Sequence, residues 1–311
     1  MDGPVAENED EALGPLRALP GRWRGRGTGW NLIALPFGGA GKGAQVRVLL
    51  NQYDEDLAFH LIDPAVANRG VGARGTTADQ LVATIDYQQS VIQTAAADFP
   101  PTELAGSGGL GIHHEPGLWL YMRNETTNGI DIARLASVPH GDAALALGRS
   151  KVIEGLAPIG SLSALPVGID VDGDVTDGLA APFAHFIANP FSGTLGDDFR
   201  GLDPRDANGP LREANDALAR SGREVTRTTV LDVDTTLEDG GVRNIPFIVK
   251  QANAVSMRST FWIQEVEGDG PRLRMQYAQV VMLEFAERDD GLPGHVAWPH
   301  VSINTLEKID A

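Results

Sequence analysis

The stretch that decides the fold reads Arg272-Leu273-Arg274-Met275-Gln276-Tyr277-Ala278-Gln279-Val280-Val281-Met282-Leu283-Glu284-Phe285. Apolar side chains recur at every second position, and polar side chains fill several of the positions between them. Successive side chains of a β-strand point to opposite faces, so this alternation predicts a half-buried strand. The apolar face contains Leu273, Met275, Tyr277, Val281, Leu283 and Phe285.

The same period of two runs through most of the chain and predicts about ten strands. So many strands, separated by Gly, Pro and Asp turns and accompanied by almost no helix, indicate an all-β protein. The pattern is typical of an antiparallel up-and-down β-barrel or a β-sandwich, and we favour the barrel. The other expected strands cover 46–51, 57–61, 81–87, 22–35, 112–122, 130–138, 143–153, 224–233, 246–266 and 295–306.

Residues 156–223 interrupt this rhythm with a segment rich in Pro, Gly and Asp. Within it, Pro210 and an apolar stripe predict a helix over about 209–221. We interpret the segment as an insertion in one barrel domain spanning 16–311, behind a flexible acidic tail over 1–15. The alternative is a domain boundary near 160, but neither half then has enough strands to close a barrel.

Composition excludes several classes of function. The formal net charge of −17 disfavours binding to nucleic acid or to anionic membranes. The absence of cysteine excludes disulfides, thiolate metal sites and cysteine nucleophiles. The chain has no apolar run long enough for a membrane helix, and its first residues are acidic rather than signal-like. We therefore expect a cytoplasmic protein.

Two histidine-containing strands carry the candidate chemistry. The first reads Ile112-His113-His114-Glu115-Pro116-Gly117-Leu118-Trp119, and its two histidines must point to opposite faces. His113 shares its face with Glu115. The second reads Trp298-Pro299-His300-Val301-Ser302-Ile303-Asn304, where His300 shares its face with Ser302. A surface pair of histidines and a structural histidine are the simpler interpretations of the two strands.

Three motifs resemble a known family of haem-binding barrels. The opening Gly21-Arg22-Trp23-Arg24-Gly25-Arg26-Gly27 is similar to the first strand of the lipocalin and fatty-acid-binding-protein (calycin) group. Its extended form looks more like the nitrobindin family, which also includes a haem-binding barrel fused to a THAP zinc finger. His113-His114-Glu115-Pro116-Gly117 resembles that family's His-x-Glu-x-Gly strand, and His300 falls where the family keeps its haem ligand. The resemblance fails over 156–245 and at Pro116.

The resemblance implies a barrel that holds haem b. His300 would be the proximal iron ligand, and His113 would be the catalytic residue on the distal side. His114, Trp23 and Ser302 complete the predicted cofactor-binding set. The iron's sixth position would accept NO, peroxynitrite or peroxide, with Arg69 or Arg134 assisting as a cation, which leaves simple gas binding, peroxidase chemistry and peroxynitrite isomerisation open.

The main alternative is a metal-free carrier. The same interior faces, lined by Leu, Met, Tyr and Phe, would suit a fatty-acid-like ligand. A metal-free enzyme is a third hypothesis, for which the sequence offers no recognisable catalytic constellation. The insertion has an apolar cluster that we expect to pack on the barrel, where it could cap the mouth or make a contact in a homo-oligomer. The cluster contains Phe183, Phe186, Ile187 and Phe191.

Overall fold

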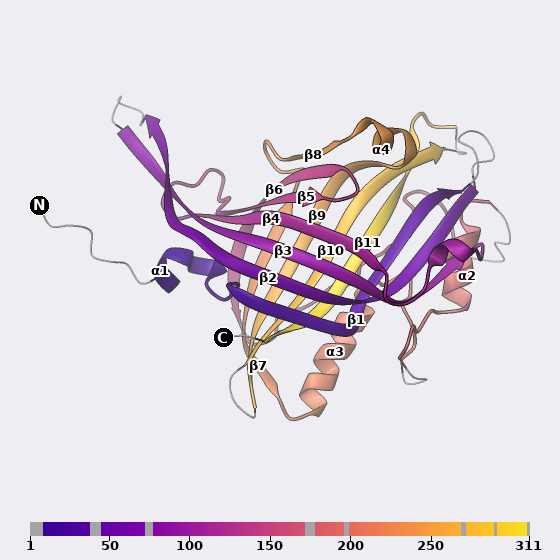
Figure 1. Cartoon of the computed structure of the whole chain (residues 1–311), viewed down its shortest axis with the longest axis horizontal. Helices are drawn as coiled ribbons and strands as arrows, with labels where there is room; N and C mark the ends of the chain where they lie inside the picture. Colours follow the sequence, from indigo (N-terminus) through magenta and orange to yellow (C-terminus); the bar gives the residue numbers. More distant parts are fainter. Residues whose placement is uncertain are drawn as a thin grey trace, which may run out of the picture.

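Ten antiparallel strands close into a barrel in the computed structural model, which describes residues 9–37, 45–71, 77–171, 178–195, 199–268, 272–288 and 291–309 (Figure 1). Strands that follow one another in the chain pair with one another, and β1 pairs with β11 to close the ring. The expected all-β up-and-down barrel is therefore confirmed. The ring strands are β1 (Gly21–Phe37), β2 (Gln45–Val71), β3 (Thr77–Phe99), β4 (Gly111–Met122), β5 (Ile132–Val138), β6 (Asp142–Glu154), β7 (Glu224–Asp234), β9 (Asn253–Glu267), β10 (Arg272–Glu287) and β11 (His295–Lys308).

A short strand, β8 (Gly241–Asn244), lies outside the ring and pairs with the first residues of β6. The helix α4 (Pro246–Gln251) follows it, where a strand over 246–266 was expected. That part of the prediction is wrong, because Pro246 favours the first turn of a helix and β9 begins only at Asn253. In the described part of the chain, no helix combines the length and the hydrophobicity needed to span a membrane.

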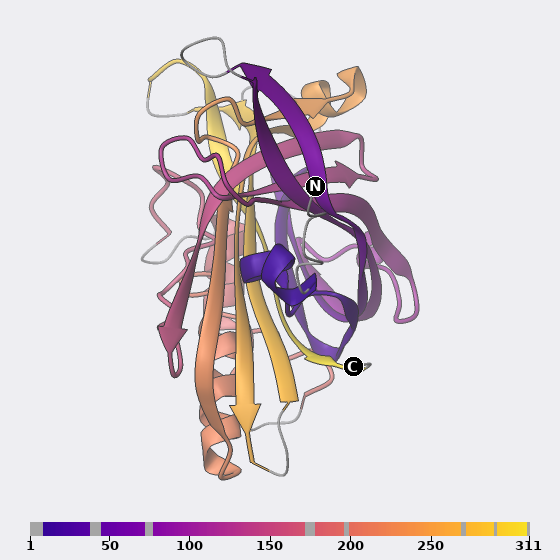
Figure 2. The same cartoon turned by 90° about the vertical axis from the view of Figure 1, so that its left-hand side faces the viewer.

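Large apolar side chains fill one end of the barrel. Trp23, Trp119, Met275 and Leu306 come from four different strands and are at most 1% exposed. The helix α1 (Glu9–Leu13) and the 3₁₀ turn η1 (Gly14–Leu16) add buried apolar side chains to this core. Figure 2 shows α1 on the side of the molecule that faces the viewer. Residues 9–16, most of which fall within the tail expected over 1–15, form this helix and turn, with Ala12, Leu13 and Leu16 buried.

The insertion packs against the barrel through two helices. In α2 (Ala181–Ala188), Phe183 is fully buried and stacks on Trp298 of β11, with the ring centroids 6.1 Å apart. Helix α3 (Gly209–Arg220) lies where the sequence predicted a helix. Another 3₁₀ turn, η2 (Glu103–Ala105), follows β3.

Helix α3 covers polar side chains on the outer face of β10. The Nε2 atom of Gln276 donates to the carbonyl oxygen of Leu211 at 2.9 Å, and Arg274 donates to Ala214 and to the side chain of Asn215. Gln276 is 0% exposed. The alternating pattern thus assigned the correct face to Arg274 and Gln276, but these residues are buried under α3 rather than solvated.

Candidate functional site

His300 lies on the inward-facing side of β11. It shares that side with Asn304, which donates to the carboxylate of Glu55 inside the barrel, and with Leu306 of the interior core. Its ring is half-buried, and Nε2 lies 2.6 Å from the side-chain amide nitrogen of Asn31 in β1. That nitrogen can only donate, so Nε2 of His300 accepts and the ring proton of the neutral form is on Nδ1.

The surroundings keep His300 neutral. Burial lowers the pKa of His300 to about 3, and positive charge on His113 or His140 would lower it further. Two more polar groups support Asn31. Its Nδ2 atom also donates to the hydroxyl of Ser302 at 2.8 Å, and its Oδ1 atom accepts from Asn51 at 3.3 Å. Ser302 therefore lies beside His300, as the sequence predicted for one face of this strand.

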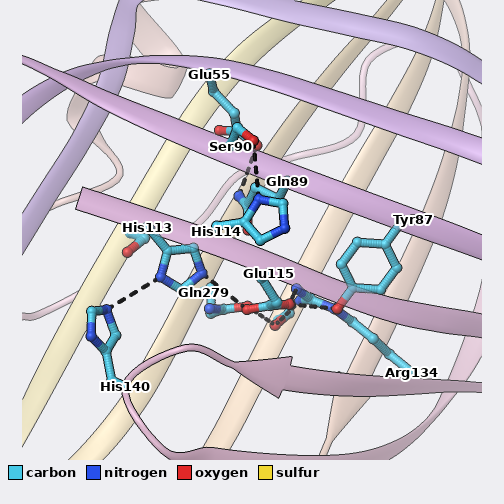
Figure 3. Close-up of polar contacts among 12 residues, drawn as sticks. Glu55, Tyr87, Gln89, Ser90, His113, His114, Glu115, Arg134, His140 and Gln279 are labelled. Carbon is cyan, nitrogen blue, oxygen red and sulfur yellow. Dashed lines mark hydrogen bonds and ion pairs between the residues drawn. The ribbon is translucent and has the colours of Figure 1, made fainter. Parts of the chain in front are cut away.

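His113 lies between a buried carboxylate and a second histidine (Figure 3). Its Nε2 atom is 3.2 Å from Oε2 of Glu115, two positions along β4, and its Nδ1 atom is 3.5 Å from Nε2 of His140. The His113 side chain is 21% exposed, and His140 is exposed in the turn between β5 and β6. Both nitrogens of His113 therefore have a polar neighbour.

Glu115 is a buried carboxylate that contacts a cation, a tyrosine hydroxyl and a histidine. It is 0% exposed, and its Oε1 atom accepts from Arg134 at 2.6 Å and from the Tyr87 hydroxyl at 2.5 Å. Burial alone would raise the pKa of Glu115, but the charge of Arg134 and the hydrogen bonds from His113 and Tyr87 hold it at about 2. Glu115 is therefore ionised at neutral pH.

Arg134 joins Glu115 to the opposite wall of the barrel. Its Nη1 atom donates to Ser259 at 3.1 Å and to Gln279 at 2.7 Å, in strands β9 and β10. The guanidinium carbon also lies 5.2 Å from the ring centroid of Tyr87, within the range of a cation–π contact. Arg134 is 3% exposed, so this network spans the interior with little contact with solvent.

A second buried carboxylate has no cationic partner among its described contacts. Glu55 in β2 accepts from Gln89 at 2.8 Å, from the Tyr277 hydroxyl at 2.7 Å and from Asn304 at 2.8 Å. Burial raises the pKa of Glu55 despite these three donors. The two interior carboxylates are therefore shifted in opposite directions, because Glu115 faces a cation and Glu55 faces neutral donors.

The remaining predicted residues lie away from His300. His114 is exposed on the opposite side of β4 from His113, where its Nδ1 atom is 3.2 Å from the Ser90 hydroxyl. Trp23 is fully buried and donates to the carbonyl oxygen of Leu19. It pairs with Lys308, eight positions from His300 along β11, which is about 27 Å at strand spacing. Arg69 is exposed, 3.9 Å from Asp79.

The sequence argument missed Glu55, Asn31 and His140 and left Arg134 as one of two options. Two of these carried a usable signal. Glu55 has the same parity as Leu57 and Phe59, and Arg134 has the same parity as Ile132 and Ala136. A charge that falls on the apolar face of a strand indicates a buried polar network. Asn31 and His140 carried no comparable signal.

Comparisons with known proteins leave the family open. No family model matches the chain, and no curated protein matches it. The crystal structure of Rv2717c from M. tuberculosis aligns with 98% of this chain and 100% of that chain, at 13% identity and a TM-score of 0.39. Among the described residues, no three histidine or carboxylate side chains are arranged to hold a metal ion.

Proposed function

We propose that this protein binds haem b inside the barrel through His300 and presents the iron to NO, peroxynitrite or peroxide. The observation that carries the proposal is a neutral, half-buried imidazole on the inward side of the closing strand. Haem iron needs a neutral imidazole nitrogen as its axial ligand, and a single histidine suffices. The donor chemistry of His300 fits this requirement.

One contact would have to be exchanged on binding. Nε2 of His300 accepts from Asn31, so coordination through Nε2 replaces that hydrogen bond. Asn31 would retain Ser302 and Asn51 as partners. The proton on Nδ1 already leaves Nε2 as the basic atom, so the ring needs no change of tautomer.

The metal-free carrier receives less support. That hypothesis placed apolar side chains of β10 around a lipid, but Met275, Tyr277, Leu283 and Phe285 are at most 7% exposed. Side chains packed so closely by protein atoms leave no room beside them for a fatty acid, and the same packing excludes haem from those positions. The half-buried groups on the inward side of the closing strand are instead polar, namely His300 and Ser302, together with Asn31 opposite them.

Bound haem would supply an iron atom with a free sixth position for a small ligand. The chain's own contribution is polar. One ring nitrogen of His113 contacts the ionised carboxylate of Glu115. His113 can therefore hold or accept a proton near a ligand. Arg134, rather than Arg69, is the interior cation, but Glu115 and Gln279 already engage it.

The test is a haemin titration followed by visible absorption. We expect the wild-type chain to develop a Soret band with saturable binding, and His300→Ala to lose at least about tenfold in affinity. His60→Ala is the matched control, because His60 is exposed and paired with Asp86. A wild-type protein that takes up no haemin but binds a fatty-acid probe would support the carrier instead.

A further inference from the structure

The contacts of His113 define a short chain of groups that leads from the surface into the core. The exposed His140 comes first, the partly exposed His113 second, and the fully buried Glu115 third (Figure 3). The two contacts along this chain are 3.5 Å and 3.2 Å. The imidazole rings of His113 and His140 are 5.5 Å apart between centroids and tilted by 43°.

The contact with Glu115 determines where His113 carries its proton. An ionised carboxylate can only accept hydrogen bonds, so Nε2 of His113 must be the protonated nitrogen. Arg134 and Tyr87 occupy the other oxygen of Glu115 and fix the carboxylate in place. In neutral His113 the lone pair is therefore on Nδ1.

Nδ1 of His113 points toward His140 rather than toward the buried network. A separation of 3.5 Å is at the outer limit of a hydrogen bond, so this contact leaves Nδ1 only weakly engaged. Partial desolvation of the His140 ring and positive charge on His113 lower the pKa of His140, while the charge of Glu115 acts in the opposite direction. The net shift favours the neutral form of His140.

We propose that Glu115 is a positioning residue that holds the ring proton of His113 on Nε2, and that His140 exchanges protons between Nδ1 of His113 and solvent. This assignment concerns residues that do not contact His300. It rests on the proposed function in one respect, because it names the ligand class. A base whose Nδ1 is only weakly engaged favours a ligand that carries a transferable proton, such as a hydroperoxide or peroxynitrous acid, over NO.

The proton transfer balances without any further reactant. A ligand that reaches Nδ1 of His113 would transfer its proton there, which leaves the ligand's conjugate base and an imidazolium. The charge of Glu115 stabilises that imidazolium, as a carboxylate beside a catalytic histidine does. The Nδ1 proton then passes to Nε2 of His140, and His140 releases a proton to water from its other nitrogen.

The tautomer can be measured without haem. Long-range ¹H–¹⁵N NMR of the protein without added ligand distinguishes Nε2-protonated from Nδ1-protonated imidazoles, and His113→Gln identifies the His113 signals. We expect His113 to be protonated on Nε2 in the wild type and in His60→Ala, and Glu115→Gln to show a mixture of tautomers. An Nδ1-protonated or averaged His113 in the wild type overturns the proposal, whether or not Glu115→Gln folds.

The ligand class is tested on haemin-loaded protein. We expect His113→Gln to slow the reaction with hydrogen peroxide by about 100-fold, and His140→Ala to slow it by less, while NO affinity stays within about twofold. Equal losses for NO and peroxide would overturn the ligand class. If the wild-type protein binds no haemin, the proposed function and the ligand class fail together. The NMR result still decides the role of Glu115.

Discussion

Nη2 of Arg134 lies 2.6 Å from Oε1 of Glu115, between two neighbouring strands of the barrel and with at most 3% of either side chain exposed. Each of these two charges is tolerated in the interior because the other one neutralises it. An unpaired charge in such a place is strongly unfavourable, whereas a paired charge that is fully hydrogen-bonded is tolerated. The pair therefore couples the stability of the fold to the position of His113.

Replacing Arg134 with Met should destabilise the protein by about 3–5 kcal/mol, because Glu115 is then buried without a cation. Urea denaturation measures the change. The double variant Arg134→Met with Glu115→Gln should recover part of the loss, since it removes the orphaned charge. A double variant less stable than Arg134→Met would contradict this account of the pair.

Acid should weaken the fold through Glu115 in a defined pH range. The pKa of Glu115 is about 2 in the folded protein, against an ordinary value of 4.5. A lowered folded pKa stabilises the protein above pH 4.5, and that contribution is lost as the pH falls from 4.5 toward 2. Denaturation at several pH values should show a shallower acid dependence for Glu115→Gln than for the wild type. Equal slopes would show that other groups control acid unfolding.

Asn31→Ala should strengthen haemin binding under the proposed function. The Asn31 amide competes with iron for Nε2 of His300, and a hydrogen bond of this kind contributes about 1 kcal/mol, or about fivefold in affinity. Absorption titration measures this change. Weaker binding in Asn31→Ala would mean that Asn31 supports the cofactor rather than competes with it.

The insertion should contribute to barrel stability through Phe183. Because this side chain is fully buried against Trp298, Phe183→Ala should cost about 3–5 kcal/mol. Phe247→Ala is the matched control, since Phe247 is 66% exposed on α4 and its loss should change stability by no more than about 0.5 kcal/mol. Equal effects of the two substitutions would show that the contact with Trp298 does not stabilise the barrel.

The alternating pattern was sufficient to predict the barrel strands but not the helices that pack on them. The period of two located β10 and oriented Tyr277 correctly, because a residue's parity fixes its face. It could not reveal that Gln276 lies under α3, since the packing of a distant helix leaves no mark on local alternation. For the same reason the segment 246–251 was predicted as a strand, although Pro246 begins a helix there.

The candidate site was predictable one strand at a time and not as a whole. Parity placed His113 with Glu115 and His300 with Ser302, and the structure has both pairs on single faces. The partners from other strands, Asn31 and His140, depend on register across the barrel, which a single sequence does not specify. Parity also predicted that His113 and His114 would diverge. Trp23 was assigned to the cofactor by resemblance alone, and it lies in the apolar core at the far end of β11.

A crystal structure of the protein soaked with haemin would test the central proposal most directly. We expect iron bonded to Nε2 of His300, the Asn31 amide displaced from that nitrogen, and His113 on the opposite face of the porphyrin. Iron held by any other side chain, or a barrel interior identical to the one described here with no porphyrin bound, would contradict it.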